Sequence, residues 1–85
     1  MLTSVLDRFI RYVTIDTTAD EASSTSPSTP GQLVLLRQLQ SELTAMGAAD
    51  VLLDEQGYLM ATIAPTTSKP DVPAIGFVAH VDTSP

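Results

Sequence analysis

Cysteine is absent from this 85-residue sequence, and positively charged side chains are few. Without cysteine the chain cannot form disulfides, thiolate zinc sites or a cysteine nucleophile. Four Lys and Arg residues stand against ten Asp and Glu residues, which gives a formal net charge of −6. Because an acidic chain is repelled by phosphate groups, nucleic acid and anionic membrane surfaces are disfavoured as partners.

Long apolar runs are also missing. No stretch approaches the roughly 20 residues that a membrane-spanning helix needs. The N-terminal stretch MLTSVLDRFIRYV is not typical of a secretory signal, because Asp7, Arg8 and Arg11 interrupt the apolar core that such a signal requires. We therefore expect a cytoplasmic protein with no membrane partner. The length of 85 residues allows one small domain at most.

Two stretches have the apolar spacing of three and four residues that is typical of amphipathic helices. The first should end near residue 15 and has Thr3 or Ser4 available as its N-cap. The second should begin with Thr29 as N-cap, and Gln32 is expected to reach back to the N-cap N–H in a capping box. The side chains expected to face a core are Leu2, Val5, Leu6, Phe9, Ile10 and Val13 in the first helix, and Leu36, Leu39, Leu43 and Met46 in the second.

Three short apolar segments follow and predict strands. Residues 51–53 and 58–63 indicate a hairpin, with Gly57 in the turn able to adopt a positive φ. Residues 72–79 are apolar at successive positions, which predicts a third strand buried on both faces. The order α-α-β-β-β indicates an α/β fold with a mixed sheet flanked by helices. Since two helices and a hairpin cannot cover a doubly buried strand, we expect residues 1–85 to be an incomplete part of one domain, with no second domain present.

The only histidine, His80, follows the third apolar segment, and Asp82 lies two residues further on. Open α/β sheets carry their chemistry just beyond the carboxyl ends of strands. Side chains at positions i and i+2 of an extended chain point the same way, roughly 6.5–7 Å apart, so the imidazole and the carboxylate can share a hydrogen bond. If one ring nitrogen binds a metal, the aspartate can hold the other. The pattern alone leaves open a structural histidine and an aspartate that starts a turn.

Three stretches together resemble a known family. The run GFVAHVDTSP, the upstream run PSTPGQ and the intervening DEQGYLMATI are similar to the N-terminal portion of tripeptide aminopeptidases in the aminoacylase-type di-zinc exopeptidase family. The resemblance spans nearly the whole chain, although the wider family shares only the apolar strand followed by H-x-D. Pro30 departs from the pattern, because relatives often carry glutamate there, but proline suits the first turn of a helix.

The resemblance implies that residues 1–85 are the N-terminal segment of a zinc-exopeptidase catalytic domain. The activity it implies is that of a zinc-dependent aminopeptidase that releases the N-terminal residue from tripeptides. It further implies that His80 is a zinc ligand and that Asp82 is a catalytic residue that orients this ligand. The complete site would hold two zinc ions, and the remaining ligands and a glutamate general base would lie downstream. The implied partners are a short peptide and the rest of the chain's own catalytic domain, without which we expect these residues to be inactive.

Two alternatives stay open. Another enzyme of the same family, such as a dipeptidase, a carboxypeptidase or an N-acyl amino acid deacylase, would use the same zinc ligands. A small acidic interaction module without catalytic activity would use His80 and Asp82 only structurally. Such a module should cover its own last strand, which the expected element order does not do.

Overall fold

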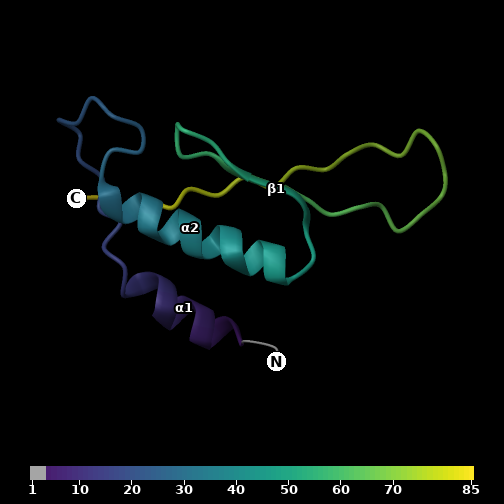
Figure 1. Cartoon of the computed structure of the whole chain (residues 1–85), viewed down its shortest axis with the longest axis horizontal. Helices are drawn as coiled ribbons and strands as arrows, with labels where there is room; N and C mark the ends of the chain where they lie inside the picture. Colours follow the sequence, from purple (N-terminus) through teal and green to yellow (C-terminus); the bar gives the residue numbers. More distant parts are fainter. Residues whose placement is uncertain (1–3) are drawn as a thin grey trace.

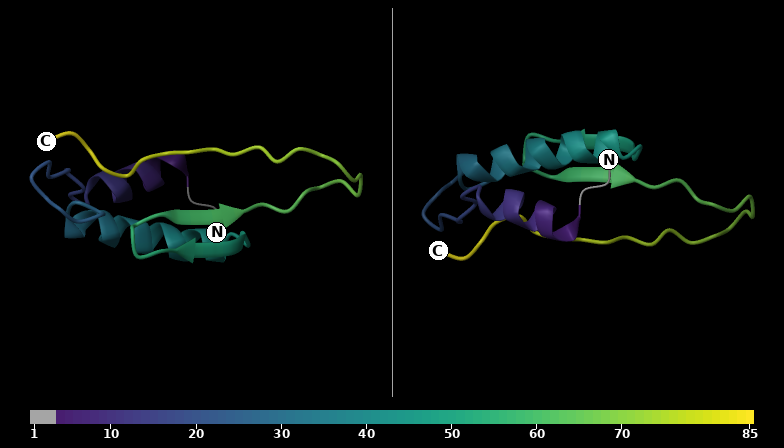
Figure 2. Two further views of the ribbon diagram at one scale, coloured as in Figure 1. Left: turned by 90° about the horizontal axis from the view of Figure 1, so that it is seen from above. Right: turned by 90° about the horizontal axis from the view of Figure 1, so that it is seen from below.

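The computed structural model describes residues 4–85, so the expectations for Leu2 and Thr3 lie outside the described residues. Its elements are α1 (Val5–Val13), α2 (Pro30–Ala45), β1 (Ala49–Leu53) and β2 (Leu59–Thr62). Figure 1 shows the two helices next to each other and the hairpin of β1 and β2 beside α2. Residues 63–85, here called the arm, project far beyond the helices and then return toward the start of α2 (Figures 1 and 2).

Helix α1 begins as the sequence indicates. The hydroxyl of Ser4 accepts a hydrogen bond from the backbone N–H of Asp7 at 3.1 Å, which satisfies a helix N–H that has no partner within the helix. The helix ends at Val13, slightly earlier than expected. Its apolar stripe is present but uncovered among the described residues, with more than half of each side chain exposed at Val5, Leu6, Phe9, Ile10 and Val13.

A cluster of polar side chains joins α1 to α2. Glu42 of α2 accepts hydrogen bonds from Arg8 at 3.3 Å, from Arg11 at 3.1 Å and from the hydroxyl of Tyr12 at 2.8 Å. Partial burial on its own would raise the pKa of Glu42. Hydrogen bonds from Tyr12 and Gln38 and the charges of Arg11 and Arg8 outweigh that effect, so the pKa lies below its ordinary value. Burial, followed by the bond to Glu42, raises the pKa of Tyr12.

The start of α2 differs from the expected capping box. Thr29 is the N-cap, but its side chain makes no capping bond and donates instead to the carbonyl of Thr18 at 3.0 Å. Gln32 reaches back one residue further than expected, where its Oε1 accepts from the N–H of Ser28 at 3.1 Å. The physical reason is the neighbouring loop, since residues 17–19 lie against this end of the helix and engage the threonine hydroxyl.

The buried core is small. Among residues 4–85, the buried apolar residues are Leu35 and Leu36 of α2, while the expected core positions Leu39 and Leu43 are half-buried and Met46 is 56% exposed. The described chain has an accessible surface of 7000 Å², whereas a compact protein of this mass would expose about 4,900 Å². Much of the apolar surface therefore stays uncovered in this structure.

The hairpin forms at the expected place. Strands β1 and β2 pair antiparallel, with Leu53 opposite Leu59. The carboxylate of Asp54 accepts hydrogen bonds from the N–H groups of Gln56 and Tyr58, both at 2.9 Å, and thereby holds the turn closed. Gly57 has φ = 85°, which confirms the expected positive φ.

The expected third strand over residues 72–79 is wrong for this structure, because these residues form no strand. Phe77 is 96% exposed and Val78 is fully exposed. A strand exists only where a neighbour pairs with its backbone N–H and C=O groups, and within residues 4–85 no segment pairs with residues 72–79. The sheet is accordingly a two-stranded antiparallel one rather than the mixed sheet expected, while the combination of helices and strands is confirmed. Over the same described range, no helix combines the length and apolar character needed to cross a membrane.

Candidate functional site

The side chains of His80 and Asp82 meet near the end of the arm. Nδ1 of His80 lies 2.8 Å from the backbone carbonyl oxygen of Asp82 and 3.1 Å from its carboxylate Oδ1. Both of these oxygens are acceptors, so the imidazole must carry its proton on Nδ1 to bond with them. The neutral ring then presents the lone pair of Nε2, and the hydrogen bond expected from the i, i+2 spacing is present.

The imidazole faces solvent. The side chain of His80 is 84% exposed and that of Asp82 is 49% exposed. Nε2 is therefore accessible as a donor to a metal ion, and the bond from Nδ1 to a carboxylate is the usual support behind a metal-bound histidine. Among residues 4–85, however, no three His, Cys, Asp or Glu side chains gather closely enough to hold a metal. The described residues thus fit one ligand position, whereas tight zinc sites need three or four protein ligands.

A short parallel bridge fixes the arm just after this pair. The N–H of Thr83 donates to the carbonyl of Thr17 at 3.1 Å, and the carbonyl of Thr83 accepts from the N–H of Ala19 at 2.9 Å. This bridge joins the arm to residues 17–19, which belong to the loop between α1 and α2. The place of His80 in space therefore depends on the loop that precedes α2.

The first turn of α2 holds that loop from the other side. Thr17 is 5% exposed and its carbonyl accepts from Nε2 of Gln32 at 3.2 Å. A Cβ placed on Gly31 would lie only 1.8 Å from the carbonyl oxygen of Asp16. Glycine at this position therefore allows the loop and the helix to approach more closely than any other residue type would permit.

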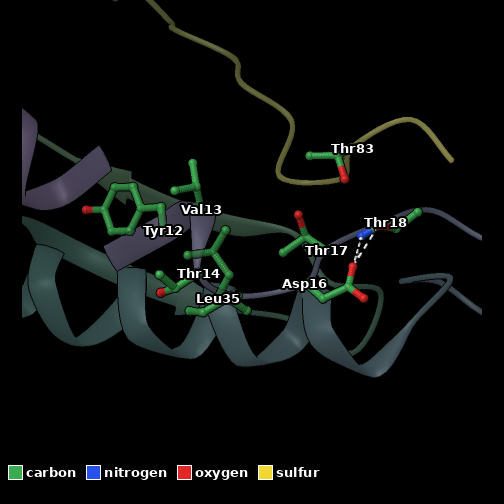
Figure 3. Close-up of a pocket in the computed structure, with 9 residues that line it drawn as sticks. Tyr12, Val13, Thr14, Asp16, Thr17, Thr18, Leu35 and Thr83 are labelled. Carbon is green, nitrogen blue, oxygen red and sulfur yellow. Dashed lines mark hydrogen bonds between the residues drawn. The ribbon is translucent and has the colours of Figure 1, made fainter. Parts of the chain in front are cut away.

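A shallow pocket of about 430 Å³ lies where the arm, the loop and α2 meet. Figure 3 shows Leu35 at its base on α2, Thr17 and Thr18 along the loop, and Thr83 where the arm passes above them. Asp16 turns toward Thr18 and accepts hydrogen bonds from its hydroxyl at 2.6 Å and its N–H at 3.0 Å. The hydroxyl bond, followed by the backbone bond, lowers the pKa of Asp16. The pocket therefore combines an apolar base with hydroxyl groups and one carboxylate.

The structure brings together the two residues that the sequence singled out, His80 and Asp82, and it adds others that the sequence did not indicate as part of a site. Thr17, Gln32 and Thr83 are tied to one another through hydrogen bonds. The sequence pattern indicates Gln32 only as a capping residue. The pairing of loop and arm links residues more than 60 positions apart, so no local pattern could have shown it.

No family model matches this sequence. Individual relatives do match it. The peptidase T of Geobacillus sp. is 51% identical over 85 residues, which is all of this chain and 20% of the relative. The peptidases T of Brevibacillus brevis and Bacillus subtilis are each 51% identical over 84 residues, which cover 99% of this chain and 20% of each relative. The chain therefore spans about one fifth of the length of these relatives, and over that fifth, the positions of His80 and Asp82 included, it is similar to peptidase T.

Proposed function

We propose that this chain supplies one zinc ligand and its orienting carboxylate to a zinc-dependent aminopeptidase that releases the N-terminal residue from tripeptides. In this proposal it forms the N-terminal segment of the catalytic domain and works in the cytoplasm. The observation that carries the proposal is the hydrogen bond from Nδ1 of His80 to Asp82, in a chain half identical over its whole length to proteins named peptidase T.

The proposed roles follow from the geometry of this pair. His80 would hold a zinc ion through Nε2, the nitrogen that carries the lone pair. Asp82 keeps the proton on Nδ1, fixes the rotation of the ring and makes the imidazole a stronger donor. A zinc ion held there, once the site is complete, would supply Lewis-acid polarisation of a peptide carbonyl and an acidified water. Among residues 4–85, no three His, Cys, Asp or Glu side chains gather closely enough to complete such a site.

The other ligands of the two-zinc site and the general base are therefore assigned to the four fifths of the relatives that this chain does not match. The chain would work only together with that remainder. Its exposed apolar surface supports this assignment, because the stripe of α1 and the segment around Phe77 and Val78 would both be covered by further structure.

A hybrid enzyme tests the proposal. In it, residues 1–85 replace the matching fifth of Bacillus subtilis peptidase T. We expect the hybrid to bind zinc and to hydrolyse tripeptides, and we expect His80→Ala to abolish hydrolysis and lower the zinc content. Asp82→Asn should reduce activity about 10- to 100-fold, as is usual for partners that orient a metal-bound histidine. Asp71→Asn is the matched control, because Asp71 is exposed on the arm and its φ of 64° suits asparagine.

The readouts separate the proposal from its alternatives. Hydrolysis of N-acyl amino acids or dipeptides in place of tripeptides would favour another enzyme of the di-zinc family. A folded, zinc-loaded hybrid that keeps full activity after His80→Ala would refute the assignment of the ligand. Zinc content is measured by elemental analysis and folding by circular dichroism, so that a loss of activity through misfolding is recognised.

A further inference from the structure

Gln32 is the most deeply buried polar residue of the described chain, with 3% of its surface exposed. Its amide makes three hydrogen bonds. Oε1 accepts from the N–H of Ser28 at 3.1 Å, and Nε2 donates to the hydroxyl of Ser28 at 3.1 Å and to the carbonyl of Thr17 at 3.2 Å. The two bonds to Ser28 hold the residue that precedes the N-cap of α2, whereas the bond to Thr17 leads from the helix to the loop.

The carbonyl of Thr17 receives a second hydrogen bond, from the N–H of Thr83 at 3.1 Å. That N–H belongs to the peptide group between Asp82 and Thr83. The carbonyl of the same peptide group accepts from Nδ1 of His80 at 2.8 Å. Because a peptide group is planar and rigid, fixing the direction of its N–H also fixes the direction of its C=O.

A continuous path of hydrogen bonds therefore leads from the interior of α2 to the exposed imidazole. It runs from the Gln32 amide to the Thr17 carbonyl, through the peptide group of residues 82 and 83, and ends at His80. The bond from Thr83 to Thr17 also polarises the peptide group and strengthens its carbonyl as an acceptor for the ring. The path begins at the buried residues Gln32 and Thr17, while the imidazole side chain at its other end is 84% exposed.

We propose that Gln32 is a positioning residue for His80, acting through the Thr17 carbonyl and the 82–83 peptide group. This inference rests on the proposed function for its catalytic consequence, but the positioning itself is independent of activity. Gln32 touches neither substrate nor metal. It fixes the direction of the Asp82 carbonyl to which Nδ1 bonds, and with it the direction of Nε2.

Gln32→Glu separates this role from helix capping. A carboxylate still accepts from the Ser28 N–H and from its hydroxyl, so the bonds at the start of α2 are kept. It cannot donate to the Thr17 carbonyl, and two acceptor oxygens would then face each other there, so the outward bond is replaced by repulsion while the bonds to Ser28 are kept. Gln40→Glu is the matched control, because it introduces the same charge in the same helix at a half-buried residue that lies away from the loop of residues 17–19 by two helical turns.

The first measurement is amide hydrogen exchange in the 85-residue chain, followed by NMR. We expect Gln32→Glu to accelerate exchange at Thr83 and Ala19 about tenfold, which is the effect of losing one supporting hydrogen bond. The ¹⁵N signals of the His80 ring should also lose the signature of a single Nδ1–H tautomer. Gln40→Glu should change neither. Unchanged exchange at Thr83 in a folded Gln32→Glu chain would overturn the proposal.

The second measurement uses the hybrid enzyme and a variant that leaves α2 intact. Thr83→Pro removes the N–H that bonds to Thr17, so it breaks the path even if Gln32→Glu does not fold. We expect both variants to lower kcat about 10- to 100-fold with KM within about twofold, because the ligand is misdirected while substrate contacts remain. A Thr83→Pro hybrid with the parent's kcat and zinc content would overturn the proposal. If the parent hybrid has no peptidase activity, the proposed function fails, and the exchange and ring signals still decide the positioning role.

Discussion

Replacement of Gly31 by alanine tests how the first turn of α2 supports the site. An alanine Cβ at this position would lie 1.8 Å from the carbonyl oxygen of Asp16, whereas ordinary contact begins at 3.4 Å. The helix and the loop would have to separate by about 1.6 Å, the difference between these two distances. Such a shift breaks the hydrogen bonds from Thr29 to Thr18 and from Gln32 to Thr17, which are 3.0 and 3.2 Å long.

The expected loss of stability is the sum of three contributions: lost hydrogen bonds, the higher helix propensity of alanine, and steric crowding. Two hydrogen bonds contribute about 1 kcal/mol each, and alanine at an unstrained helical position would return about 1 kcal/mol relative to glycine. Steric crowding costs about 1–3 kcal/mol. The Gly31→Ala chain should therefore be less stable by about 2–4 kcal/mol, a sum built on the hydrogen-bond, helix-propensity and crowding values.

Urea denaturation followed by circular dichroism measures this loss. Ser41→Ala is the matched control, because Ser41 lies on the exposed side of the same helix; it should stabilise by up to about 0.5 kcal/mol through helix propensity alone. If Gly31→Ala is as stable as the parent and Thr83 keeps its protection from hydrogen exchange, the close approach of loop and helix does not hold the arm.

Three further changes test other parts of the molecule. Because the folded-state pKa of Glu42 is lowered, the charged cluster contributes stability above the ordinary glutamate pKa of 4.5 and loses it as the pH falls through the lower folded value. Glu42→Gln should lower the free energy of unfolding by about 1 kcal/mol at neutral pH and reduce its dependence on pH in the acid range. A variant whose stability depends on pH as the parent's does would contradict the role of the cluster. Val78→Lys should raise the solubility of the chain, because the exposed segment around Phe77 is a template for strand pairing between copies. Light scattering measures this, and a parent chain that stays monomeric at high concentration would contradict it. Calorimetric titration should give the 85-residue chain a zinc dissociation constant above about 1 μM, because His80 is a single ligand. Submicromolar binding would refute this expectation.

Local patterns in the sequence determined the elements of this chain. The apolar spacing of three and four residues predicted both helices, because such a pattern is stable only when it lies along one face of a helix. Ser4 and Gly57 marked a helix start and a hairpin turn, since each has a chemical property that its position requires. The spacing of His80 and Asp82 predicted their hydrogen bond, because extended chain places both side chains on one side.

Tertiary structure alone decided the rest. Residues 72–79 have the composition of a buried strand, yet they remain unpaired because a strand depends on a neighbour that its own sequence does not contain. Gln32 matched a capping pattern, but the approach of residues 17–19 gave its amide a different partner. The bridge between Thr18 and Thr83 joins distant segments, so the support beneath the imidazole could be recognised only once the chain had folded.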